Sequence, residues 1–77
     1  MQDPEAFAHD VYERTLAILE TRAAASGFDI AEVRAELEAL QVYDGHGWVG
    51  RNAFKDAEIE GQIDAYQVFL YRRSIGA

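Results

Sequence analysis

Residues 45–50, with the sequence GHGWVG, have the residue types and spacing most suggestive of chemistry in this chain. They match the pattern G-x-G-x-x-G, whose glycines allow the tight turn and close backbone approach that bind pyrophosphate in dinucleotide-binding proteins. That chemistry requires a strand before the glycines and a βαβ unit around them, but the preceding residues have helical periodicity. We therefore interpret residues 44–51 as a loop that reverses the chain and places Trp48 over the core, and we expect no cofactor.

Two kinds of ligand remain open for this loop. Its N–H groups, together with Arg51 and Lys55, could hold an anion at the start of the following helix. Alternatively, His46 and Trp48 could line a pocket for a small molecule, since functional residues concentrate on loops. The simpler interpretation is structural, because the only tryptophan of a small domain usually anchors the core and donates its N–H to a carbonyl.

The spacing of the other polar residues indicates neither a metal site nor a catalytic site. His9 and His46 lie in different predicted elements, and the sequence has no H-x-x-x-H or E-x-x-H pair and no cysteine. Asp44 does not begin a calcium-binding loop, because the next ligand positions hold His46 and Trp48. His9 and Glu13 are spaced as an exposed i,i+4 pair on a polar helix face. We expect no metal ion and no enzymatic activity.

The acidic residues form the most informative charge pattern. The chain has 14 acidic and 7 basic residues, for a formal net charge of −7. Asp56, Glu60 and Asp64 recur every four residues, which places like charges on one helix face at a cost of roughly a few tenths of a kcal/mol per pair. This row is either a solvated face or a strip that docks a basic partner. The net charge argues against direct binding to nucleic acid or to an anionic membrane.

Three helices are predicted to carry these residues. The first spans about residues 4–26, with Asp3 as its N-cap, Pro4 at its first position and Gly27 at the position where helices commonly end. Ile18 belongs to its apolar stripe.

The second helix spans about residues 30–42 and begins with the spacing of a capping box, formed by Asp29 and Glu32. Only two or three residues separate it from the first helix, so these two helices are expected to form an antiparallel hairpin.

The third helix, over about residues 52–73 with Asn52 as its N-cap, has two apolar faces that must both be covered. One stripe consists of Ile59, Ile63, Tyr66 and Leu70. The other consists of Phe54, Ala57, Gly61, Ala65 and Val68. The small residues of this second stripe allow another backbone to pack closely.

The chain is therefore expected to be a single all-α domain, in which a longer third helix packs on the hairpin. A domain of 77 residues buries only about 60% of the surface of its unfolded chain. If one stripe of the third helix packs on the hairpin, the other is left for a partner. The favoured function is a non-enzymatic protein-binding or regulatory module, acting on a second copy of itself or on a basic heterologous protein. The predicted contact residues are Asp56, Ile59, Glu60, Ile63, Asp64, Tyr66 and Leu70.

Two other functions stay open. One is an acidic inhibitor of bacterial or phage type, anti-CRISPR-like or DNA-mimic-like, that occupies the basic nucleic-acid-binding groove of a partner protein. The other is binding of a small ligand at the loop that contains His46, Trp48 and Arg51. No apolar run is long enough for a membrane span and the first five residues lack the basic start of a signal peptide, so we expect a soluble cytoplasmic protein.

Overall fold

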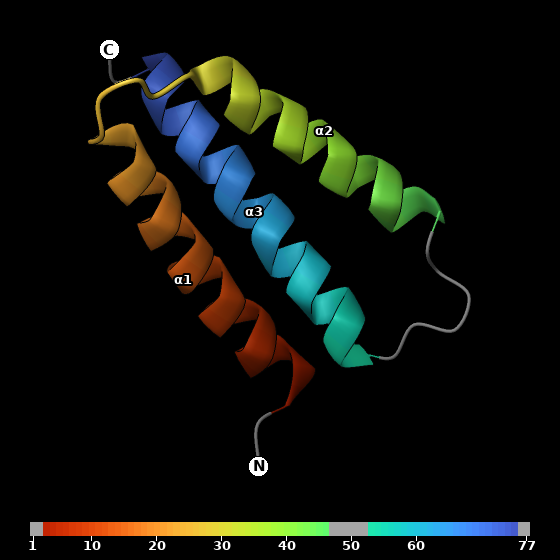
Figure 1. Ribbon diagram of the computed structural model, residues 1–77. Helices are drawn as coiled ribbons and strands as arrows, with labels where there is room; N and C mark the ends of the chain where they lie inside the picture. The colour runs from red at the N-terminus through yellow and green to blue at the C-terminus, as the bar shows by residue number, and fades with distance from the viewer. Residues whose placement is uncertain (1–2, 47–52, 76–77) are drawn as a thin grey trace.

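The computed structural model describes residues 3–46 and 53–75, which form three helices (Figure 1). These are α1 (Pro4–Ala23), α2 (Ile30–His46) and α3 (Ala53–Ile75). The described residues contain no strand. The prediction of a small all-α domain of three helices is confirmed.

The start of α1 follows the sequence, but its end does not. The Asp3 carboxylate accepts a hydrogen bond from the Ala6 backbone N–H at 2.7 Å, so it caps the helix as predicted. The helix ends at Ala23, three residues before the predicted end at residue 26. The next two N–H groups bond three residues back instead of four, which tightens the backbone and ends the helix. Gly27 then takes a φ of 81°, in the left-handed region that favours glycine.

The second helix is longer than predicted. Asp29 caps its start, with the carboxylate accepting a hydrogen bond from the Ala31 N–H at 2.9 Å. It continues through His46, whereas a glycine-rich loop was predicted from residue 44. A single glycine costs a helix only about 1 kcal/mol relative to alanine, so Gly45 does not end it. The predictions for Trp48, Arg51 and Asn52 lie outside the described residues.

The third helix lies between the other two (Figure 1). It runs parallel to α1 and antiparallel to α2, and it contacts both. Within the described part of the chain, no Cα atom of α1 comes within 8 Å of a Cα atom of α2. The first two helices are therefore consecutive and antiparallel, as predicted, and side chains such as Arg22 and Glu36 join them, while their backbones stay apart.

The small-residue stripe of α3 packs directly on the backbone of α1, as its composition predicted. Ala57 and Ala65 are buried, and so is Gly61 between them. A Cβ atom built on Gly61 would lie 2.5 Å from the carbonyl oxygen of Ala8. Such a distance leaves no space for any side chain at this position.

The other apolar face of α3 is also covered within the chain. The fully buried core consists of one large side chain from each helix, Leu19, Val33 and Phe69. Tyr66 and Leu70 pack against this cluster, and Ile59 is only 2% exposed. The expectation that one stripe of α3 is left over for a partner is therefore wrong, because α1 and α2 take opposite sides of the helix.

We predict that Gly61→Ala lowers the free energy of unfolding by about 1–2 kcal/mol, because the new methyl group pushes α1 away from α3. Helix propensity alone predicts the opposite, a gain of up to about 1 kcal/mol. Urea unfolding followed by circular dichroism measures the sign directly. Ala17→Gly, at an exposed position of α1, gives the propensity difference in the same protein. A more stable Gly61→Ala variant would show that the helices are not in close contact here.

Candidate functional site

The separation of α1 from α2 leaves an open apolar groove with α3 as its floor. Its larger part has a volume of about 450 Å³. A further hollow of about 350 Å³ shares Thr15, Ile18 and Gln62 with it and extends toward the start of α1. We define the inter-helix groove by the residues that line these two hollows: Phe7, Val11, Arg14, Thr15, Ile18, Glu36, Ala39, Leu40, Tyr43, Glu58, Gln62 and Tyr66.

Helical spacing explains how three separate segments line one groove. Glu58, Gln62 and Tyr66 recur every four residues along α3, so they form one row on its surface. The wall from α2 repeats every three or four residues from Glu36 to Tyr43. The groove therefore follows the helices lengthwise.

The rim of the groove exposes large apolar side chains. Ile18 is 60% exposed and Tyr43 is 48% exposed, on opposite walls. Small side chains between them, at Thr15 and Ala39, keep the groove open. Apolar surface that gathers along a concave face, as it does here, is typical of an interface.

A polar network connects the three helices at one position along the groove. Arg22 of α1 donates two hydrogen bonds to the Glu36 carboxylate of α2, at 2.8 and 3.1 Å. The Tyr66 hydroxyl of α3 donates a third to the same carboxylate, at 2.8 Å. The bidentate contact with Arg22 lowers the pKa of Glu36 against the opposing effect of burial, and the Tyr66 hydrogen bond lowers it further. Burial, followed by the neighbouring Glu36, raises the pKa of Tyr66.

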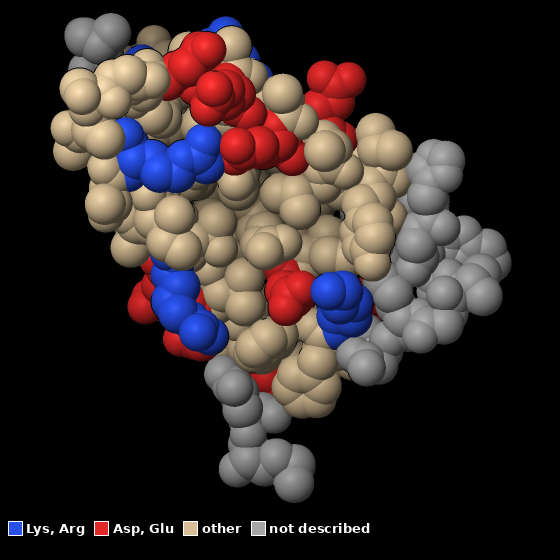
Figure 2. Space-filling model, viewed as in Figure 1, with Lys and Arg blue, Asp and Glu red and all other residues tan. Residues whose placement is uncertain are grey.

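The remaining charged side chains of the groove are paired with neighbours on their own helices. Arg14 forms an ion pair with Asp10 on α1. Glu58 forms one with Lys55 on α3, at 3.0 Å. Figure 2 shows a broad uncharged area on this face, with blue atoms beside red ones at its edges and a further group of red atoms at the top of the view. Both walls and the floor of the groove are thus close to neutral, although the chain carries a charge of −7.

The predicted acidic strip lies on the opposite side of α3. Asp56, Glu60 and Asp64 are all exposed. At 3.6 residues per turn, Glu60 is about 160° around the helix from Gln62 on the groove floor. The two faces of the domain therefore differ, one apolar and charge-balanced, the other with a row of carboxylates.

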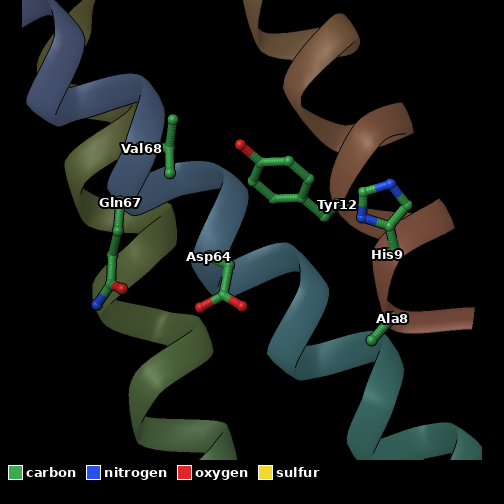
Figure 3. A pocket seen from close by; sticks show the side chains of 6 residues that line it. All are labelled: Ala8, His9, Tyr12, Asp64, Gln67 and Val68. Atoms are coloured by element: carbon green, nitrogen blue, oxygen red, sulfur yellow. The ribbon is translucent and has the colours of Figure 1, made fainter. Parts of the chain in front are cut away.

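A shallow pocket between α1 and α3 borders the acidic strip (Figure 3). Its polar side chains are His9, Tyr12, Asp64 and Gln67. His9 lies 2.7 Å from Glu13, which confirms the predicted i,i+4 pair, and its ring stacks on Tyr12 with centroids 6.2 Å apart. His9 is exposed, and its ring nitrogen contacts Glu13 instead of a residue that lines the pocket. The side chains that line this pocket are therefore not arranged as an acid, a base and a nucleophile around one point.

The residues that the sequence predicted as a partner contact differ in burial in the structure. Ile59 is buried, while Ile63, Tyr66 and Leu70 are half-buried. Only the acidic members of that set remain fully on the surface. His46 ends α2 and its side chain is not among those described.

Sequence reasoning missed the groove itself. Ile18 belongs to the apolar stripe of α1, which predicted burial, and Ala39 carries no sequence feature that indicates a site.

Within residues 3–46 and 53–75, no group of three His, Cys, Asp or Glu side chains is placed to hold a metal ion. None of the three described helices combines the length and the apolar composition that crossing a bilayer requires. Comparisons with protein-family models, with curated proteins and with solved structures find no match for this chain.

We predict that Glu36→Gln costs about 0.5–1 kcal/mol of stability at pH 7, because it removes a half-exposed ion pair. A lowered pKa means that the ionised carboxylate stabilises the fold above the ordinary value of 4.5, and that this contribution is lost as pH falls through the lowered value. The difference between the variant and wild type should therefore shrink in acid. Urea unfolding from pH 7 to pH 3.5 measures it, with Glu38→Gln on an exposed position of α2 as the control. A difference that does not change with pH would contradict the assignment.

Proposed function

We propose that this protein is a non-enzymatic protein-binding module and that the inter-helix groove is its contact surface. The functional class is the one that the sequence favours. The contact moves from the apolar stripe of α3 to the groove, because Ile59 of that stripe is buried and Tyr66 is the stripe residue that lines the groove.

One observation supports this proposal above the others, which is the combination of an exposed apolar wall with a hollow beside it. Ile18 keeps 60% of its surface exposed next to a hollow of about 450 Å³. Burying a side chain of this size contributes about 1.5–3 kcal/mol. An amphipathic helix, which places apolar residues at i, i+3, i+4 and i+7, matches an elongated groove of this kind.

A second candidate function follows from the acidic strip. Asp56, Glu60 and Asp64 are exposed on the face opposite the groove, where they can meet a basic surface. This face suits either a basic regulatory partner or the acidic-inhibitor function, in which the strip occupies a nucleic-acid-binding groove. Both complexes would weaken steeply as salt is added, because exposed charges are screened beyond about 10 Å at 0.1 M.

Site-specific photo-crosslinking in cells of the source organism separates these two surfaces. A diazirine-bearing residue at position 39 reports on the groove, and the same residue at position 67 reports on the opposite face. We expect a protein adduct at position 39 that Ile18→Glu reduces at least about tenfold, since a charge on the groove wall opposes apolar contact. Ala17→Glu, which adds the same charge at a neighbouring exposed position, should leave the adduct unchanged.

An adduct at position 67 but not at position 39 would replace the groove with the acidic face as the contact surface. Absence of a protein adduct at both positions would overturn both candidates.

Neutralising the acidic strip tests the second candidate. We predict that Asp56→Asn, Glu60→Gln and Asp64→Asn together leave the helical content unchanged and alter stability by less than about 0.5 kcal/mol, because the three side chains are exposed. If the strip docks a basic partner, the triple variant loses the adduct at position 67 and the complex loses its salt dependence. An unaltered adduct would show that the strip only solvates the domain.

A further inference from the structure

We infer that the occupant of the inter-helix groove is a second copy of this chain, in a twofold dimer whose two grooves face each other. This inference rests on the proposed function, because it names the partner of the same surface.

The distribution of charge selects this arrangement. Two copies that each carry a net charge of −7 repel one another unless their uncompensated carboxylates stay apart. The charged groups of the groove are already compensated within the chain, since Glu36 binds Arg22 and Glu58 binds Lys55. Approach through the groove therefore brings neutral surfaces together.

The position of the acidic strip points to the same arrangement. Asp56, Glu60 and Asp64 lie on the side of α3 that faces away from the groove. When two grooves meet, the two strips end up on the outer surfaces of the dimer, with both domains between them. A basic partner, by contrast, would gain nothing from the neutral face and would bind the acidic one.

The groove face carries both a projecting apolar side chain and a hollow, which a twofold contact requires. Ile18 projects from the wall formed by α1, and the hollow beside it is bounded across the groove by Ala39 and Leu40 of α2. A twofold rotation places the Ile18 of each copy over the hollow of the other, so one pair of residues makes the contact twice. The domain extends 38 × 28 Å across its two longest axes, which is enough for the roughly 800 Å² that each partner buries in a standard interface.

Analytical ultracentrifugation of the purified full chain tests this inference. We expect a reversible species of twice the 8.6 kDa chain mass at protein concentrations of about 1 µM to 1 mM, which covers weak and moderate affinities. Because contacts between exposed like charges are screened by salt, the dimer should hold or tighten between 0.05 and 0.5 M NaCl. A complex that depends on the acidic strip would weaken over that range.

Two groove variants and one control locate the interface. Ile18→Glu should raise the dimer dissociation constant at least about 100-fold, because the twofold axis places the new charge at two positions in the contact. Ala39→Arg, which fills the hollow from the other wall, should do the same and covers the case in which the first variant does not fold. Ala17→Glu adds an equal charge outside the groove and should change the constant less than about threefold. Circular dichroism checks the fold of each.

The possible results distinguish this inference from the proposed function. A chain that stays monomeric at 1 mM, or a dimer that withstands both groove variants, overturns the groove-to-groove dimer. If such a monomer still gives an adduct at position 39 that Ile18→Glu removes, and the adduct has the mass of a different protein, the groove remains a protein-binding site with another occupant. An adduct at position 39 with twice the chain mass supports both conclusions.

Discussion

The close approach of α1 to α3 at Gly61 determines how the rest of the domain is arranged. With no side chain at this position, the backbone of α1 lies so near that a Cβ atom would be 2.5 Å from the Ala8 carbonyl oxygen. Such contact commits one face of α3 entirely to α1. The larger residues of the other stripe, which include Ile59 and Leu70, lie about 150–200° around the helix from Gly61. Because α1 and α2 flank α3 on different sides, their backbones stay apart. They meet only through side chains such as Arg22 and Glu36, and the groove is the space that remains between them.

The Arg22–Glu36–Tyr66 network bridges that space at the one described position where side chains of all three helices share a carboxylate. The hydrogen bonds are worth little individually at this degree of exposure. They matter more for the orientation of the side chains. The bidentate guanidinium of Arg22 fixes the direction of the Glu36 carboxylate, and the Tyr66 hydroxyl joins α3 to the same carboxylate. Tyr66 also shows why the predicted apolar stripe of α3 does not form a separate contact surface. Its ring packs against the core while its hydroxyl serves the network, so it contributes to the floor of the groove.

The sequence predicted those features that short segments determine by themselves. The caps at Asp3 and Asp29 and the two apolar faces of α3 depend on local hydrogen bonds and helical periodicity, and both appear in the structure. The end of α1 could not be predicted, because residues 23–26 are three alanines and a serine and contain no residue that stops a helix. The extension of α2 through Gly45 reversed a prediction based on the number of glycines, since a local cost of about 1 kcal/mol does not outweigh the rest of a helix.

The pairing of the helices was beyond the sequence for a different reason. A short connection between α1 and α2 favours an antiparallel hairpin, but the same apolar stripes can pack on a third helix that offers a face to each. Small residues at Ala57, Gly61 and Ala65 allow the closer contact, and close contact gains the most dispersion energy. The candidate site results from the packing of α1 and α2 on α3 and not from any sequence motif. Ile18 and Ala39 lie on different helices and face each other only across the groove that this packing leaves.

The distribution of charge completes the physical picture of the domain. Few large side chains among the described residues are almost wholly removed from water, namely Leu19, Val33, Ile59 and Phe69, so the core of the domain is small. Ile18 stays exposed in the single chain, so the free energy that burial of its apolar surface would contribute is not gained there. A net negative chain can recover it only at a surface where its own charges are already balanced, and the pairs at Glu36 and Glu58 provide that balance on the groove face. In the dimer that we propose, the separation of an acidic face from an apolar, neutral face is thus the feature that directs association to the groove.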